Sequence, residues 1–381
     1  MILLDDVPRP NYVCIFPHLY NFQLIKDVGM IPFTMGRLFN YHASIVTYAN
    51  DDYSYMDKDL KDENFELDFI KKRFNNHNYD IFLYLICNSR SIDVLQVFHF
   101  HDTLNILFYF LIYKSLNWNG KIYAKLDADY NLTKFLAEDK GFWPGIRNFI
   151  LKHLVDVLSV ETAESYQMLL DSKLKYHGKL IHMPNGVDIH VTPELMVDDK
   201  KEYILTVGRL GSEEKATEVL LEAFSKIKDH KNWKLILVGK FEHQFQDYVN
   251  EYFQIHPHLR EKVIFTGFIE DRNKIYRYYA QSKIFCFTSR SESFGIALVE
   301  AAYFGDYLVS TNVGGAQDVL KVTDYGELFE TDNIPILVDR LEDLISNWHK
   351  YEADPRQKMN LMEENFSWPH LCEKLYKKLN E

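Results

Sequence analysis

The sequence predicts an α/β protein with two domains, each built on a parallel sheet. Short β-branched runs alternate with helical patterns along most of the chain, which is typical of βαβ units. The 381 residues suffice for two domains with separate cores. The turn-forming sequence Pro184-Asn185-Gly186-Val187-Asp188 is followed by a polar stretch over 192–201, and together they mark a boundary near the middle.

The expected strands are short apolar runs, each followed by a helical stretch. In the first half they are Tyr12–Phe16, Ile45–Tyr48, Val94–Phe98, Ile122–Leu126 and Val157–Val160. In the second half they are Tyr203–Val207, Lys234–Val238, Val263–Thr266, Ile284–Thr288 and Tyr307–Ser310. The run Ile81–Ile86 fits either a strand or a buried helical turn, because periodicity does not decide over so few residues. We place the domains at 1–188 and 189–365, with a C-terminal helix in 366–381 that returns to the first domain.

The charge and cysteine content exclude some classes of protein. Lys and Arg total 43 against 55 acidic residues, a net charge of −12, which disfavours nucleic-acid binding. Apolar residues make up 47% of the chain, so a packed globular protein is expected. The isolated cysteines indicate a reducing compartment and no structural zinc site; they are Cys14, Cys87, Cys286 and Cys372.

The N-terminus lacks a basic and apolar leader, so we expect no signal peptide and a cytoplasmic location. The longest apolar stretch, Leu104–Tyr113, is shorter than the roughly 20 residues that span a bilayer. The helix expected over Leu104–Leu116 is apolar nearly all round, which fits either a buried core helix or a surface that dips into a membrane. The small basic cluster Lys71, Lys72 and Arg73 leaves peripheral contact at the inner membrane face as a second option.

The strongest functional signal is a pair of acids around a predicted helix start. Glu292 lies in the loop before the helix, and Glu300 lies about a turn and a half inside it. The amides of Phe294, Gly295 and Ile296 are expected to point outward as unpaired donors. Two carboxylates beside such donors suit a ligand rich in hydroxyl groups. The alternative is two ordinary surface acids, since negative charge is favourable at a helix start.

A second signal is Arg209 at the end of a strand, followed by Lys215 near the next helix start. Arg offers a planar fork for phosphate oxygens, and Lys adds a compact positive charge. The alternative is a solvated Arg209 and a Lys215 paired with Glu213 or Glu214.

A third signal is Val313-Gly314-Gly315, which follows another strand and opens a helix. The two glycines allow a close backbone approach to an anion, although a plain turn has the same composition. All three loops follow strands of one predicted parallel sheet, so they converge on the same sheet edge.

Three motifs follow one another along the chain: Gly-Arg-Leu…Lys, then Glu-x7-Glu with Phe-Gly inside, then Val-Gly-Gly. This order resembles that of the retaining GT-B glycosyltransferases of family 4, glycosyl transferases group 1. The resemblance is strong over 184–320 and diffuse before it. It implies two Rossmann-like domains with parallel sheets facing across a cleft. It also implies transfer of a hexose from a nucleotide-diphosphate sugar, UDP-linked or GDP-linked, in polysaccharide or glycoconjugate biosynthesis. The acceptor would be a glycan, a lipid-linked glycan or a protein, and neither metal nor cofactor is expected.

The resemblance also implies roles for individual residues. Arg209 and Lys215 would neutralise the donor diphosphate, and Glu300 would bind the ribose hydroxyls. Glu292 and the amides at 294–296 would hold the transferred sugar, while 313–315 would contact phosphate or sugar. Phe268 would face the base. Gly29 would let a helix start of the first domain approach the phosphates, although a packing role fits this glycine equally well.

The first domain carries two ambiguous motifs. His99, His101 and Asp102 follow a predicted strand. The histidines could be packed in the core or could line an acceptor cleft. A metal site is a third interpretation, although a third nearby ligand is lacking. Asp127 and Asp129 match the metal–diphosphate motif of the other glycosyltransferase fold, GT-A. Many GT-B relatives carry a histidine at about this strand end, and Asp127 stands there in this sequence. We assign Asp127 a contact with the donor sugar or with acceptor hydroxyls.

Two other functions remain open: a GT-B-shaped nucleotide-sugar epimerase, and a non-catalytic partner subunit that keeps the fold. A dehydrogenase is disfavoured because no GxGxxG sequence follows any expected strand.

Overall fold

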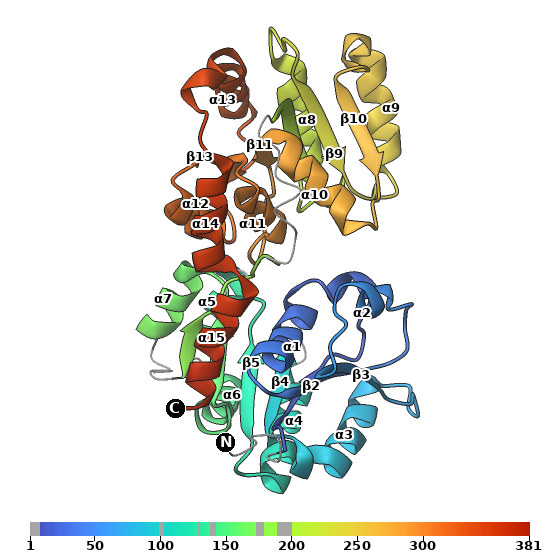
Figure 1. Ribbon diagram of the computed structural model, residues 1–381, viewed down its shortest axis with the longest axis vertical. Coiled ribbons are helices and arrows are strands. Elements are labelled where there is room, and N and C mark those ends of the chain that lie inside the picture. Colours follow the sequence, from blue (N-terminus) through green and yellow to red (C-terminus); the bar gives the residue numbers. More distant parts are fainter. Residues whose placement is uncertain (1–7, 99–102, 129, 138–141, 173–178, 189–199) are drawn as a thin grey trace, which may run out of the picture. The chain divides into compact units, whose positions relative to one another are not determined.

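The computed structural model describes residues 8–98, 103–128, 130–137, 142–172, 179–188 and 200–381, and structural statements below concern these residues. The chain divides into two compact units. Unit 1 comprises 1–186 and 368–381, and unit 2 comprises 187–367. Each unit is a parallel sheet with helices on both faces (Figure 1), so the predicted fold class, two parallel-sheet α/β domains, is confirmed.

The sheet of unit 1 has seven parallel strands in the order β3-β2-β1-β4-β5-β6-β7. The strands are β1 (Asn11–Ile15), β2 (His42–Thr47), β3 (Phe65–Phe69), β4 (Val94–Phe98), β5 (Lys121–Lys125), β6 (Val157–Val160) and β7 (Leu180–His182). All five strands expected from the sequence are present. The two that the sequence did not predict, β3 and β7, are the edge strands, where one side of the strand lacks a neighbour.

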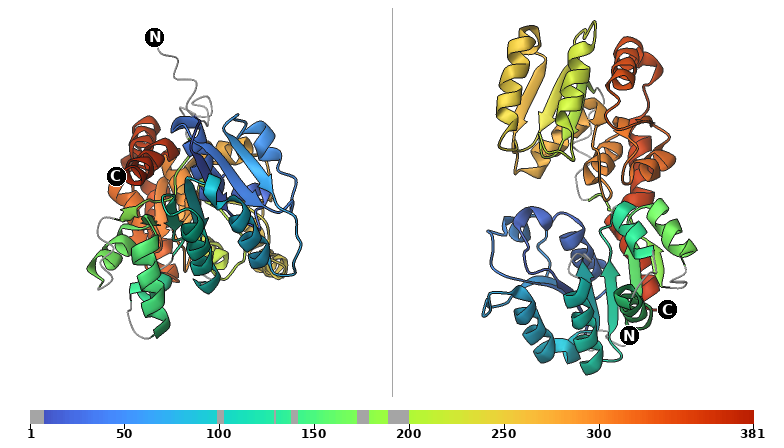
Figure 2. Two further views of the ribbon diagram at one scale, coloured as in Figure 1. Left: turned by 90° about the horizontal axis from the view of Figure 1, so that it is seen from below. Right: turned by 180° about the vertical axis from the view of Figure 1, so that it is seen from behind.

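Helices cover both faces of this sheet (Figure 2). One face carries α3 (His77–Asn88), α4 (Thr103–Leu116), α5 (Tyr130–Ala137), α6 (Phe142–Leu154) and α7 (Ala163–Asp171). The other carries α1 (Asp27–Leu38), α2 (Ser54–Lys58) and α15 (Trp368–Leu379). The ambiguous run Ile81–Ile86 lies within α3 and is therefore helical.

The final helix, α15, belongs to unit 1 (red in Figure 1). Trp368, Leu371 and Leu375 are at most 1% exposed and share a core cluster with Tyr12 of β1 and Met30 of α1. The last residues of the chain therefore complete the hydrophobic core of the first domain.

Unit 2 has six parallel strands in the order β10-β9-β8-β11-β12-β13. They are β8 (Lys201–Val207), β9 (Lys234–Val238), β10 (Val263–Gly267), β11 (Ser282–Phe287), β12 (Tyr307–Thr311) and β13 (Gly326–Phe329). One face carries α8 (Thr217–Lys226), α9 (Phe245–Ile255) and α13 (Ile334–Asn347). The other carries α10 (Arg272–Gln281), α11 (Ile296–Tyr303), α12 (Ala316–Thr323) and α14 (Pro355–Phe366).

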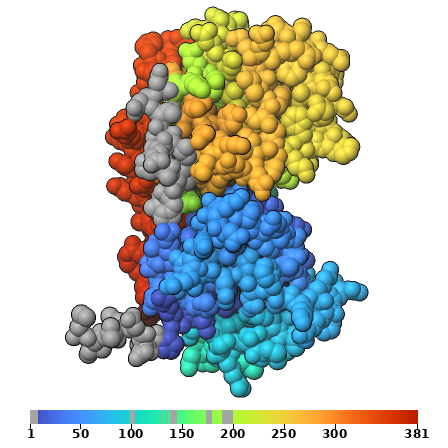
Figure 3. Space-filling model, turned by 45° about the vertical axis from the view of Figure 1, so that its right-hand side comes forward, coloured from blue at the N-terminus to red at the C-terminus, as the bar shows by residue number. Residues whose placement is uncertain are grey.

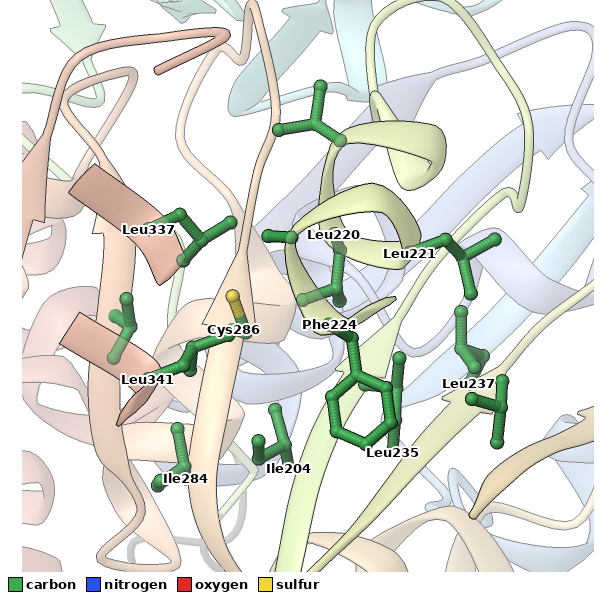
Figure 4. Close-up of a cluster of buried hydrophobic side chains, with 14 of the residues drawn as sticks. Ile204, Leu220, Leu221, Phe224, Leu235, Leu237, Ile284, Cys286, Leu337 and Leu341 are labelled. Atoms are coloured by element: carbon green, nitrogen blue, oxygen red, sulfur yellow. The ribbon is translucent and has the colours of Figure 1, made fainter. Parts of the chain in front are cut away.

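The core of unit 2 under α8 and α13 is a cluster of buried aliphatic and aromatic side chains, part of which Figure 4 shows. Leu220 and Phe224 of α8 and Leu337 of α13 project toward Leu235 of β9 and Cys286 of β11, and each of these side chains is fully buried. This packing holds α8 and α13 against the sheet whose strand ends carry the candidate site.

Helix α4 is apolar on two faces with different surroundings. Leu107 and Phe110 are buried in the core of unit 1, whereas Leu104, Phe108 and Leu111 are 51%, 52% and 42% exposed. The core-helix interpretation therefore accounts for one face only. Among the described residues, every helix is too short or too polar to cross a lipid bilayer.

We expect Leu371→Ala to lower the free energy of unfolding by about 2–5 kcal/mol, because it leaves a cavity at a fully buried site in unit 1. Lys377→Ala, on the exposed face of the same helix, should change it by less than about 0.5 kcal/mol. Urea unfolding followed by circular dichroism measures both, and equal midpoints for the two variants would contradict the docking of α15.

Candidate active site

The strand order of unit 2 reverses between β8 and β11, because β9 and β10 lie on one side of this pair and β12 and β13 on the other. Ligands of open parallel sheets bind beyond the carboxyl ends of the strands at such a reversal. The loops after β8, β11 and β12 leave the sheet at this edge, and they contain most of the predicted donor-site residues.

Lys215 and Glu292, predicted from separate motifs, are in contact. The Lys215 ammonium forms an ion pair with Oε1 of Glu292, and the Ser289 hydroxyl donates to the same oxygen at 2.8 Å. The Lys215 Nζ also lies 5.5 Å from the centroid of the Phe287 ring. The two charged side chains are 24% and 12% exposed, so a ligand can reach both. The ion pair of Lys215 is with Glu292 rather than with Glu213 or Glu214.

Arg209 lies on the same edge but is 60% exposed. Its guanidinium is 3.3 Å from a carboxylate oxygen of Glu214 and 3.9 Å from one of Glu242. Exposed ion pairs of this kind contribute about 0–1 kcal/mol, so Arg209 can exchange them for a phosphate at little cost. The pKa of the Glu214 carboxyl group is lowered, mainly by hydrogen bonds from its own backbone amide and from the Ser212 hydroxyl. The positive charges of Arg209 and Lys215 have a smaller effect in the same direction.

The glycine motifs bring two of the loops together. Gly295 has φ of +101° and precedes the first turn of α11, whose first residue is Ile296. Gly314 has φ of +54°, and a Cβ there would lie 2.8 Å from the Cβ of Glu292. A Cβ on Gly315 would lie 2.2 Å from the Phe294 ring, and the Gly315 amide donates to the Phe294 carbonyl at 2.8 Å. The packing of the two loops thus requires these glycines. The contact of Val313, Gly314 and Gly315 with a phosphate stays a prediction.

Glu300 is held by two partners that the sequence analysis did not identify. Its Oε1 lies 3.4 Å from the Arg272 guanidinium, and its Oε2 accepts a hydrogen bond from the Tyr279 hydroxyl at 3.1 Å. Burial and the Glu300 carboxylate raise the pKa of Tyr279 well above its usual value, so the hydroxyl remains a donor. Arg272 also contacts Asp188 at 3.5 Å. A carboxylate accepts several hydrogen bonds at once, which is the property that the predicted contact of Glu300 with ribose hydroxyls needs.

Phe268 lies beside a cavity of about 600 Å³ beyond the ends of β9 and β10. Its side chain is 68% exposed, and Lys240, Phe241 and Gln246 line the same cavity. An exposed ring next to a cavity offers a stacking surface, which is compatible with the predicted contact to a base.

In unit 1, Asp127 follows β5 and belongs to a buried cluster of charged groups. Lys125, at the end of β5, is fully buried, and its Nζ lies 2.5 Å from Glu161 Oε1 and 3.4 Å from Asp27 Oδ2. Burial disfavours the ammonium, but Glu161 and Asp27 outweigh it and raise the pKa of Lys125. Burial raises the pKa of Glu161 well above its usual value, against the opposing effect of Lys125. The nearby carboxyl groups of Asp127 and Asp27 raise the pKa of Glu161 further.

The remaining predicted residues of unit 1 have mixed outcomes. Gly29 lies in the first turn of α1, where a Cβ would come within 1.9 Å of the Leu24 carbonyl oxygen, so a packing role is present. Its approach to a phosphate stays a prediction. His99, with His101, Asp102 and Asp129, lies outside the described residues. Within the described part of the chain, no group of three or more His, Cys, Asp or Glu is arranged to hold a metal ion.

Residues 192–360 match the family model described as Glycosyl transferases group 1. An uncharacterized glycosyltransferase of Methanocaldococcus jannaschii is 28% identical over 177 residues, which cover 46% of this chain and 44% of that protein. The spore coat protein SA of Bacillus subtilis is 26% identical over 52% of this chain and 54% of that protein. The chain thus spans about half the length of these curated relatives. The resemblance that the sequence analysis found over 184–320 thus agrees with the family match over 192–360.

The solved structure of Anabaena HepE in complex with UDP and glucose has a TM-score of 0.69 to this chain. Its sequence is 15% identical, and the alignment covers 97% of this chain and 99% of that one. At this identity the likeness establishes the fold, which is GT-B.

Lys125→Met should lower the free energy of unfolding by about 3–5 kcal/mol, because it leaves buried carboxyl groups without their positive partner. The double variant Lys125→Met with Glu161→Leu should recover part of this loss, because it removes the Glu161 carboxyl group together with the ammonium, while Asp27 still loses its contact with Lys125. Urea unfolding at pH 7 measures both variants. A double variant no more stable than the single one would contradict the assigned pairing.

Proposed function

We propose that this chain, whose residues 192–360 match the Glycosyl transferases group 1 model, is a retaining glycosyltransferase that uses a nucleotide-diphosphate hexose. The observation that carries the proposal is the contact of Lys215 with Glu292 at the strand-order reversal of unit 2, with Arg209 on the loop after β8 at the same sheet edge. Cations beside a helix start and a carboxylate match a diphosphate joined to a sugar.

Donor binding would exchange partners within this site. The donor diphosphate would take Lys215 from Glu292 and Arg209 from Glu214, since each cation is accessible. Glu292, released from Lys215, would accept hydrogen bonds from hydroxyls of the hexose. The positive groups would then stabilise the negative charge that develops on the leaving phosphate, which accelerates bond cleavage without a metal ion.

The other end of the donor would lie toward Glu300 and Phe268. Glu300, oriented by Arg272 and Tyr279, would accept hydrogen bonds from the ribose. Phe268 would stack on the base. We favour a UDP-sugar because a protein of the same fold, Anabaena HepE, has a solved complex with UDP and glucose; a GDP-sugar is the alternative.

Transfer would proceed on one face of the sugar. The bond from the anomeric carbon to the phosphate oxygen breaks and leaves its electron pair on the phosphate. The acceptor oxygen forms its bond to the same carbon from the same face, and its proton passes to a phosphate oxygen. The configuration at the anomeric carbon is thereby retained. The acceptor would be a glycan, a lipid-linked glycan or a protein in polysaccharide or glycoconjugate biosynthesis.

We also propose peripheral contact with an anionic membrane through unit 1. A chain of aromatic contacts runs from Phe74 through Tyr79 and Phe82 to Phe108, with centroid distances of 5.8, 6.1 and 6.3 Å. We call these four residues the aromatic strip. The exposed basic residues 71–73 precede it on the segment between β3 and α3, which protrudes on the surface (light blue in Figure 3). Apolar side chains beside basic ones suit an anionic lipid surface.

Arg209→Ala and Glu300→Ala should each weaken UDP binding by about 10–100-fold, because each removes a hydrogen bond to a charged group. Isothermal titration measures the affinity, and Arg260→Ala and Glu261→Ala are matched controls on the exposed surface of unit 2. Unchanged affinity in both site variants would refute the donor site.

Turnover with a panel of UDP- and GDP-sugars tests the reaction itself. We expect release of nucleotide diphosphate, unaffected by EDTA, and a product with the anomeric configuration of the donor. Interconversion of donors without an acceptor would indicate an epimerase instead. Donor binding without any turnover would indicate a non-catalytic partner subunit.

Phe108→Glu should abolish flotation of the protein with vesicles that contain anionic lipid, because it places a charge within the aromatic strip. Ile255→Glu is the matched control, since Ile255 is a 63% exposed residue of unit 2. Wild-type protein that does not float with anionic vesicles, or a Phe108→Glu variant that still does, would contradict membrane contact through this strip.

A further inference from the structure

The sheet of unit 1 has its own strand-order reversal, between β1 and β4. A pocket of about 330 Å³ lies there, beyond the carboxyl ends of these two strands. Phe16 and His18 follow β1 at this pocket, and Phe98 ends β4. The position is therefore the one at which an open parallel sheet binds its ligand.

The walls of this pocket are mainly apolar. Phe16 and Phe98 meet edge to face at 5.8 Å between ring centroids, and Ile106 of α4 lines the space with them. The polar atoms of two further lining residues engage each other, because the Tyr109 hydroxyl donates to Asn78 Oδ1 at 2.5 Å. An apolar cavity of about 150 Å³ already accommodates benzene, so this pocket has room for an aryl group with substituents.

A histidine pair supplies the polar groups on the solvent side of the pocket. His18 Nε2 lies 3.3 Å from His77 Nδ1, with the ring centroids 4.9 Å apart. His18 is exposed and His77 half-buried, so the pair is accessible from outside. Each neutral imidazole carries one donor and one acceptor nitrogen, which allows the pair to hydrogen-bond a hydroxyl group in either direction.

We infer that this pocket binds an apolar aryl or alkyl group of the sugar acceptor, with the accepting hydroxyl beside His18 and His77. The inference rests on the proposed function in naming the ligand an acceptor, and it adds the chemical class of that acceptor. An aglycone that places a ring or a short hydrocarbon chain next to the hydroxyl fits the pocket. A fully hydroxylated sugar does not, because the Phe16, Phe98 and Ile106 walls offer its hydroxyls no partners.

The probe for this site is 4-fluorobenzyl alcohol, observed by ¹⁹F NMR with the full-length protein. We expect binding to the wild type and at least about tenfold weaker binding to Ile106→Phe, which fills the pocket. The matched control is Leu111→Phe, the same kind of enlargement at an exposed position of α4. Phe16→Ala, which removes part of the wall, gives a second weakened variant should Ile106→Phe fail to fold.

Competition then identifies the ligand class. Phenyl and hexyl β-glucosides should displace the probe, and methyl β-glucoside should not at the same concentration. The inference is overturned if the probe does not bind wild type, if Ile106→Phe binds it as tightly as Leu111→Phe does, or if methyl β-glucoside displaces it equally well. UDP affinity, measured in parallel with the Arg209→Ala and Glu300→Ala variants, tests the proposed function separately, because Arg209 and Glu300 lie in unit 2.

Discussion

The reversal of strand order within each parallel sheet is the constraint on which the rest of the structure depends. On the two sides of a reversal the connecting helices pack on opposite faces, so the loops after the two central strands diverge and leave room for a ligand. In unit 2 the reversal lies between β8 and β11 and gathers charged groups. In unit 1 it lies between β1 and β4 and gathers apolar ones. One topological feature thus underlies two candidate sites of opposite chemical character.

Exposure separates ion pairs that can exchange partners from those that only hold the fold. Lys215 and Glu292 are 24% and 12% exposed, so under the proposed function a diphosphate would compete for the lysine while a sugar would take the carboxylate. Lys125 and Glu161 form a similar pair at 0% exposure, where desolvation is already complete and the loss of a partner leaves a buried charge. The first pair suits binding and the second suits rigidity. A Lys–Glu pair can serve either purpose, and the extent of its burial decides between them.

The sequence predicted the central strands but not three of the edge strands, β3, β7 and β13. Central strands of a parallel sheet are covered on both faces and appear as continuous apolar runs. Only the first residue of Phe65–Phe69 is buried, and Leu180–His182 is only three residues long, so neither produces such a run. In the site, local motifs identified the loops that carry Arg209 and Glu292. They could not identify Arg272 as a partner of Glu300, because only the packing of α10 against α11 brings these distant residues together.

The glycine pair after β12 shows why several weak motifs together are informative. Alone, Gly314 and Gly315 fit a plain turn, and the structure gives them a packing role that needs no ligand. That role, however, is to let the loop lie against Glu292 and Phe294, since a Cβ on either glycine would collide with one of them. The glycines therefore set the position of the acid, which in turn contacts Lys215. Residues from the loops after β8, β11 and β12 form one packed assembly, so each motif constrains the next through contact rather than through sequence spacing.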